Sequence, residues 1–311
     1  MRAVVIGGNG FIGSHLVDAL LADRWQITVY DRAPERYRPP MPGVEYVQGE
    51  LGNAGLLGTV LDGGDVLFHL ASTTIPESSN DAPIFDIQSN LVDTVRLLDV
   101  CVARHVKKVI FLSSGGTVYG TPNALPVTEA APTHPICSYG IVKLTIEKYL
   151  QLYKHLHDLS YTILRPSNPY GPRQNPVGHQ GVVGVFLGRI AQELPISVWG
   201  DGEIIRDYLH VTDLVRACLA AATTETTGPI FNIASGQGTS LNQLLEVIER
   251  VIGRPPRIVR LPARPFDVPR LVLDSKRAQR ALRWQPQIPL EEGILDTWNW
   301  VRDLQWLHRV P

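Results

Sequence analysis

Short apolar segments alternate with longer amphipathic segments along the first half of the chain. The short segments are rich in Val, Ile and Leu and apolar on both faces, which is typical of strands in a parallel sheet covered on both sides. The predicted strands are Ala3–Ile6, Ile27–Tyr30, Val44–Val47, Val66–Leu70, Val109–Leu112 and Tyr161–Leu164. Apolar residues recur at helical spacing between them, as at Ile12, Leu16, Ala19 and Leu20. The alternation predicts an α/β fold with a doubly wound parallel sheet.

The pattern changes after Pro166. The segment Asn168–Gly178 is rich in Pro, Gly and Asn, which predicts a loop. The other elements predicted in this half are helices at Val182–Gln192 and Thr212–Ala222, a strand at Ile230–Ile233 that returns to the main sheet, an irregular proline-rich segment at Arg254–Pro269 and a closing helix over 290–307.

The length of 311 residues suits one large domain or two closely associated ones. We expect residues 1–166, with 205–235 returning to them, to form a cofactor-binding domain. Residues 167–204 and 236–311 are expected to form a smaller substrate-binding domain.

Composition excludes several classes of protein. Lys plus Arg number 29 and Asp plus Glu number 30, so the net charge of -1 gives no reason to expect nucleic acid or a membrane surface as a partner. No apolar run approaches the ~20 residues that span a bilayer, and the N-terminus lacks the features of a signal peptide. The three cysteines have neither disulfide nor zinc spacing, so we expect no metal and a reduced, cytoplasmic setting.

A glycine-rich turn, Gly7 to Gly13, follows the first predicted strand and opens a helix. Glycines let the backbone approach a pyrophosphate, and the helix N-terminus offers free N–H groups to the anion. The second strand ends at Asp31, where an acid accepts hydrogen bonds from a ribose and repels a 2′-phosphate. NAD is therefore favoured over NADP, although Arg32 and Arg36 weaken the preference. The alternative is that Asp31 only caps a turn.

Tyr139 and Lys143 are four residues apart and share one face of a predicted helix. A neighbouring ammonium and a positive nicotinamide ring both lower the pKa of a phenol, which can then take a proton from a carbinol. The spacing alone is common on helix surfaces. The upstream dinucleotide turn and the strand that ends in Ser113 and Ser114 favour the catalytic interpretation.

These residues lie in a series of motifs that together resemble the extended short-chain dehydrogenase/reductase superfamily, and most closely the UDP-glucose 4-epimerase-like NAD-dependent epimerases. The motifs, in chain order, are GGNGFIG at 7–13, FHLAS at 68–72, FLSSGGTVYG at 111–120, YGIVK at 139–143, LRPSNPYGP at 164–172, WGDGEIIRDYLHV at 199–211 and ARPFDVPRLVLD at 263–274. The last three are the more specific to enzymes of nucleoside diphosphate sugars. The resemblance implies a Rossmann-type sheet and a homodimer formed by the helices near 91–105 and 138–157.

The resemblance also implies roles for individual residues. Tyr139 would be the base, and Lys143 would bridge the nicotinamide ribose. The other expected cofactor contacts are Gly7, Gly10, Phe11, Ile12, Asp31, Arg32, Glu50, Leu51, Leu70, Ala71, Ser72, Asn90, Ser113 and Pro166. The expected substrate contacts are Asn168 at the pyrophosphate, Gln180, Gly181 and Val182 along the nucleotide, Arg206 and Arg264 on the two phosphates, and Tyr208 and Asp267 near the ribose.

Two positions depart from the family pattern. Gly115 stands where the family usually has Ser or Thr, whose hydroxyl bonds the reacting sugar oxygen. Ser114 or Thr117 would then supply a substitute, unless a water does or Gly115 only widens the pocket. Leu271 occupies the position that flanks the sugar, and its intermediate size leaves plain, N-acetylated and uronic sugars open.

The expected activity is 4-epimerisation of a UDP-hexose or derivative through a transient 4-keto sugar. A nucleotide-sugar dehydratase is the first alternative, but it needs an acid–base pair where this chain has Gly116 and Thr117. The second alternative is a non-catalytic module that binds NAD or a nucleotide sugar.

Overall fold

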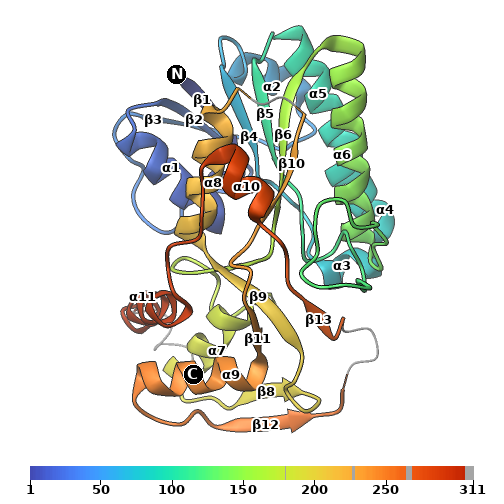
Figure 1. Cartoon of the computed structure of the whole chain (residues 1–311). Coiled ribbons are helices and arrows are strands. Elements are labelled where there is room, and N and C mark those ends of the chain that lie inside the picture. The colour runs from blue at the N-terminus through green and yellow to red at the C-terminus, as the bar shows by residue number, and fades with distance from the viewer. Residues whose placement is uncertain (179, 226–227, 264–267, 305–311) are drawn as a thin grey trace.

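The computed structural model describes residues 1–178, 180–225, 228–263 and 268–304. Its larger lobe is built on a seven-stranded parallel sheet with the order β10-β6-β5-β4-β1-β2-β3 (Figure 1). The strands are β1 (Arg2–Ile6), β2 (Gln26–Asp31), β3 (Val44–Gln48), β4 (Val66–His69), β5 (Lys108–Leu112), β6 (Ser160–Pro166) and β10 (Ile230–Ile233). The doubly wound α/β prediction is confirmed, including the return of Ile230–Ile233, which pairs with β6.

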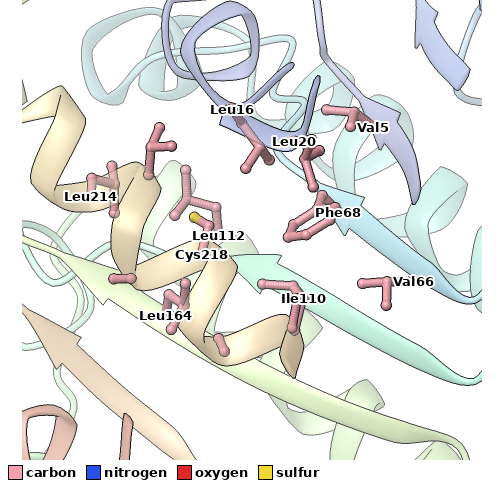
Figure 2. Close-up of a cluster of buried hydrophobic side chains, with 14 of the residues drawn as sticks. Val5, Leu16, Leu20, Val66, Phe68, Ile110, Leu112, Leu164, Leu214 and Cys218 are labelled. Atoms are coloured by element: carbon pink, nitrogen blue, oxygen red, sulfur yellow. The ribbon is translucent and has the colours of Figure 1, made fainter. Parts of the chain in front are cut away.

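Helices cover both faces of this sheet (Figure 1). One face carries α1 (Phe11–Ala22), α8 (Val211–Thr223) and α10 (Lys276–Leu282), and the other carries α2 (Ala54–Val60), α5 (Asp93–Ala103) and α6 (Ser138–His157). Figure 2 shows the first of these layers, where Leu16 and Leu20 of α1 and Leu214 of α8 meet Phe68 and Ile110 of the sheet. The apolar stripe predicted at Ile12, Leu16, Ala19 and Leu20 is therefore the face of α1 that packs on the sheet.

The strand order reverses its direction between β1 and β4. The chain leaves β1 for one face of the sheet and leaves β4 for the other, so the loops after these neighbouring strands diverge. Ligands of open α/β sheets bind beyond the carboxyl ends of the strands at such a switch point. Three short helical elements, α3 (Pro76–Asp81), α4 (Pro83–Asp86) and the π-helix η1 (Ile87–Val92), follow β4 and lie beside α6.

The smaller lobe contains a mixed sheet and a separate two-stranded one (Figure 1). The mixed sheet comprises β7 (Asn168–Tyr170), β9 (Ile205–His210), β11 (Gly238–Ser240) and β13 (Arg270–Leu271), and the two-stranded sheet comprises β8 (Ile196–Trp199) and β12 (Ile258–Leu261). The helices α7 (Val182–Ala191), α9 (Leu241–Ile252) and α11 (Leu290–Arg302) pack around a second apolar core. No helix in the described ranges is long and apolar enough to cross a bilayer.

Three features of this lobe differ from the pattern-based expectation. The segment Arg254–Pro269 is not wholly irregular, because Ile258–Leu261 pairs in parallel with β8. Helix α9 was not predicted, although Ser240 and Gln243 form a capping box at its start. Within 205–235, α8 and β10 return to the larger sheet, whereas β9 pairs with β7, β11 and β13 in the smaller one. The exact domain boundaries stay a prediction.

Candidate functional site

The glycine-rich turn closes tightly at the carboxyl end of β1. Gly7 has a φ of +83°, and its N–H donates to the Tyr30 carbonyl at 2.9 Å. A Cβ on Gly7 would lie 2.9 Å from the Ala71 nitrogen, and a Cβ on Gly13 would lie 2.1 Å from the Gly7 oxygen. The turn, the first helix and the loop after β4 therefore approach one another too closely for side chains. Gly10, Phe11 and Ile12 begin α1 at this point.

Asp31 faces this turn from the end of β2. Its carboxylate accepts hydrogen bonds from the backbone N–H groups of Asn9 and Ala33, each at 3.0 Å. These contacts fix the carboxylate beside the turn, where an acid suits a ribose without a 2′-phosphate. Arg32 is exposed. The residues present thus fit an NAD dinucleotide, with backbone N–H groups at the start of α1 for the pyrophosphate and Asp31 for the ribose.

The remaining predicted cofactor residues are distributed around the same edge of the sheet. Glu50 is exposed and Leu51 is buried after β3, while Leu70, Ala71 and Ser72 follow β4 with partial or full exposure. Pro166 ends β6, and its carbonyl accepts the Gly115 N–H at 2.9 Å. Ser113 lies at the end of β5, but its hydroxyl is buried and donates to Glu147 at 2.6 Å. A cofactor contact from the Ser113 side chain would require that bond to break.

Tyr139 and Lys143 lie in the first two turns of α6, as predicted. The Lys143 ammonium lies 5.6 Å from the centroid of the Tyr139 ring and donates to the Leu112 carbonyl at 3.0 Å. Burial lowers the pKa of Lys143 to about 8, although Asp86 and Glu147 act in the opposite direction. Burial also raises the pKa of Tyr139, with smaller contributions from Cys137 and Asp86. The pKa of Tyr139 is therefore raised in the protein alone, not lowered as the spacing with Lys143 predicts.

A buried carboxylate holds the first turn of α6 against the loop after β4. Asp86 is fully buried and accepts hydrogen bonds from Thr74 Oγ1 at 2.6 Å, Asn90 Nδ2 at 2.9 Å and Ser138 Oγ at 2.7 Å. The Asn90 amide oxygen also accepts the Thr73 N–H at 2.9 Å. Asn90, which was predicted near the cofactor, thus lies behind Tyr139. Through Asp86 it orders the turn that precedes Tyr139. Nothing in the local sequence pattern marked Asp86.

The turn after β5 presents the two hydroxyls predicted to replace the family Ser or Thr. Ser114 is half-buried, and its Oγ has no hydrogen-bond partner in the described part of the chain. The Thr117 hydroxyl is buried and also lacks a partner among the described residues. Gly115 lies between them and is buried. The two candidates therefore differ in their access to a ligand.

The predicted substrate residues divide between the surface and the interior of the smaller lobe. Asn168 donates to the Asp207 carbonyl at 3.0 Å, and Gln180, Gly181 and Val182 lead into α7 with at least partial exposure. Arg206 lies on β9, where its guanidinium donates to the Val268 carbonyl at 2.6 Å.

Tyr208 has a buried hydroxyl, and its ring packs edge-on against Tyr170, which makes it a core residue in this structure. Leu271 is likewise buried in an apolar cluster with Val118 and Leu273, away from the exposed surface. Arg264 and Asp267 lie outside the described residues.

Comparison with known proteins agrees with this geometry. Residues 3–234 match the model of the NAD dependent epimerase/dehydratase family. The chain belongs to this family. A UDP-glucose 4-epimerase of Mycolicibacterium smegmatis is 38% identical over 97% of this chain and 99% of its own length.

Two solved relatives extend the comparison to structure. The UDP-glucose 4-epimerase of Thermotoga maritima, solved with UDP-glucose, is 35% identical with a TM-score of 0.93, covering 97% of this chain and 99% of that one. The UDP-glucose 4-epimerase of Thermus thermophilus, solved with NAD, is 32% identical with a TM-score of 0.90, covering 98% and 100%. The family assignment from motifs is confirmed, and the chain is an NAD-dependent, UDP-glucose 4-epimerase-like enzyme.

Proposed function

We propose that this family member interconverts the C4 epimers of a UDP-hexose or a derivative of one. The observation that carries the proposal is the placement of the Lys143 ammonium 5.6 Å from the Tyr139 ring, at the same edge of the sheet as the dinucleotide turn. The relatives named above, which include a structure with UDP-glucose, support a UDP-sugar as the substrate.

Tyr139 would act as the base for the C4 hydroxyl of the sugar. Bound NAD supplies a hydride acceptor that returns the hydride at the end of the reaction. Tyr139 would hold the C4 proton while the sugar is a 4-ketone and return it afterwards. Burial raises the pKa of the phenol, and the Lys143 ammonium beside the ring is the group of this chain that would favour the phenolate.

Other residues would bind and orient the substrate. Asn168 and Arg206 lie on β7 and β9, which belong to the mixed sheet of the smaller lobe. Arg206 is suited to the pyrophosphate because its guanidinium can bond two oxygens. Gln180 to Val182, at the start of α7, would line the nucleotide.

Purified enzyme should interconvert UDP-glucose and UDP-galactose, or their N-acetyl or uronic counterparts, without added NAD. Product ratios measured from both directions should reach the same equilibrium. A dehydratase would instead release an irreversible 4-keto-6-deoxy product. A non-catalytic module would show neither product while still gaining melting temperature with UDP-glucose.

We also propose a homodimer. Helix α6 exposes Ile141, Leu152 and Leu156, which recur at helical spacing on one stripe, and α4, which packs beside α6, exposes Ile84 and Phe85. Exposed apolar side chains on neighbouring helices are typical of an interface between subunits, and a two-fold axis would place α6 against its symmetry mate.

A further inference from the structure

Gly115 has no room for any side chain. A Cβ at this position would lie 2.4 Å from Leu273 Cδ1 and 3.0 Å from the carbonyl oxygens of Arg165 and Pro166. The Gly115 N–H is bonded to the same Pro166 carbonyl at 2.9 Å, so the backbone cannot move away without breaking that bond. The volume in which a Ser or Thr side chain would begin is therefore occupied by the Leu273 methyl group.

Leu273 is held firmly in this place. It is fully buried in an apolar cluster with Val118, Tyr119 and Val127. The backbone on either side of Leu273 is bonded to Val127, whose N–H donates to the Val272 carbonyl and whose carbonyl accepts the Asp274 N–H, each at 2.8 Å. Adding a side chain to an interior packed this closely destabilises the fold.

The neighbouring hydroxyl of Ser114 faces a more open environment. A Cβ built on Gly116 would meet only Ser114 Oγ, at 3.8 Å, among the described residues within 4 Å. Apart from its own chain neighbours, no other described residue crowds the Gly116 side of the half-buried Ser114, whereas the Thr117 hydroxyl is buried. The Ser114 side chain is therefore the more accessible of the two hydroxyl groups to a sugar oxygen.

We infer that Gly115 and Leu273 act as a matched pair that excludes a hydroxyl at position 115 and assigns the hydrogen bond to the reacting sugar oxygen to Ser114. Leu273 is then a positioning residue, since it acts through the space it fills. The inference rests on the proposed function, because it names the second group that contacts the sugar at C4.

The catalytic half of the inference is tested by rescue, with UDP-glucose or whichever UDP-hexose the wild type turns over. Ser114→Ala should lower kcat roughly 10- to 100-fold, the loss of one hydrogen bond made in the transition state, with KM, melting temperature and bound NAD little changed. Adding both Gly115→Ser and Leu273→Ala to the Ser114→Ala protein should raise its kcat about 10-fold. Adding Leu273→Ala alone should restore none, because no hydroxyl is supplied.

The steric exclusion of a side chain at position 115 is tested by thermal unfolding, which needs no activity assay. Gly115→Ser should lower the melting temperature, and Leu273→Ala in the same chain should recover much of that loss. Val127→Ala controls for a cavity in the same apolar cluster and should not recover it.

Three results would overturn the inference. The first is a kcat of Ser114→Ala near the wild-type value, or a kcat of Thr117→Val that falls further than that of Ser114→Ala. The second is equal rescue by Leu273→Ala alone. The third is a Gly115→Ser protein as stable as the wild type. A wild type that turns over no UDP-hexose would instead refute the proposed function, and the assignment of Ser114 with it.

Discussion

Glu147 and Arg165 form a buried, bidentate ion pair directly beneath the proposed catalytic lysine. Glu147 Oε1 accepts Arg165 Nε at 2.9 Å and Glu147 Oε2 accepts Arg165 NH2 at 2.5 Å, with the two side chains 1% and 3% exposed. Arg165 also donates to the Tyr119 hydroxyl at 2.9 Å. Glu147 lies one helical turn after Lys143, so the pair ties α6 to β6 next to the site.

We predict that Glu147→Gln destabilises the protein by about 3 kcal/mol, because it leaves the Arg165 guanidinium buried without its counter-ion. The free energy of unfolding in urea measures this. The exposed pair Arg250 and Glu291 offers a matched control, and Glu291→Gln should change stability by less than about 0.5 kcal/mol. Equal effects of the two substitutions would show that burial of the first pair has no energetic consequence.

Tyr139→Phe should lower kcat at least about 10³-fold, since no other group described near the site is placed to exchange the C4 proton. The fold should be unaffected, because the Tyr139 hydroxyl makes no hydrogen bond to another residue in the described part of the chain. Turnover of UDP-glucose and the amount of co-purified NAD are the measurements. Near-normal turnover with NAD retained would remove Tyr139 from the mechanism.

Lys143→Met should abolish most turnover yet stabilise the fold at neutral pH. Burial lowers the pKa of Lys143 to about 8, against about 10.4 in an unfolded chain. The unfolded chain therefore binds more protons between these values, and stability rises with pH there. Below pH 8 the full cost of the buried charge is present, so Met should gain about 2 kcal/mol at pH 7 and less at pH 10. A loss of stability at pH 7 would contradict the buried-charge argument.

Gly13→Ala should prevent tight NAD binding and destabilise the protein. Its Cβ would lie 2.1 Å from the Gly7 oxygen and would force the turn apart. Gly55 is a matched control, since it also lies in a helix but its Cβ would meet only Asn53 Oδ1, at 3.8 Å. Gly55→Ala should stabilise by about 0.5–1 kcal/mol. Thermal unfolding and NAD titration of the two variants distinguish the cases, and similar behaviour of both would refute the close approach.

Leu152→Glu combined with Leu156→Glu should convert a dimer into a monomer, because four charges would have to be desolvated across the two-fold axis. Light scattering after size exclusion measures the mass. Leu194→Glu places a charge on another exposed leucine, in the smaller lobe, and should leave the mass unchanged. A monomeric wild type would exclude the proposed interface.

Local sequence patterns by themselves determined much of the larger lobe and of its proposed site. The glycine turn between β1 and α1, the acid at the end of β2 and the Tyr139–Lys143 spacing each lie within one or two elements, where period and spacing alone constrain the backbone. The order of the family motifs added the identity of the site. The exposed strand Ile258–Leu261 escaped this kind of prediction, and so did α9 despite the capping box at its start.

Tertiary structure decided which of these residues are free to act. Leu273 fills the volume beside Gly115 from more than a hundred residues away, and Tyr208 is turned into the core of the smaller lobe. Burial raises the pKa of Tyr139 although the Lys143 ammonium lies 5.6 Å from its ring. Contacts between distant segments leave no period in the sequence, and desolvation depends on every atom that surrounds a group, so neither can be derived from local spacing.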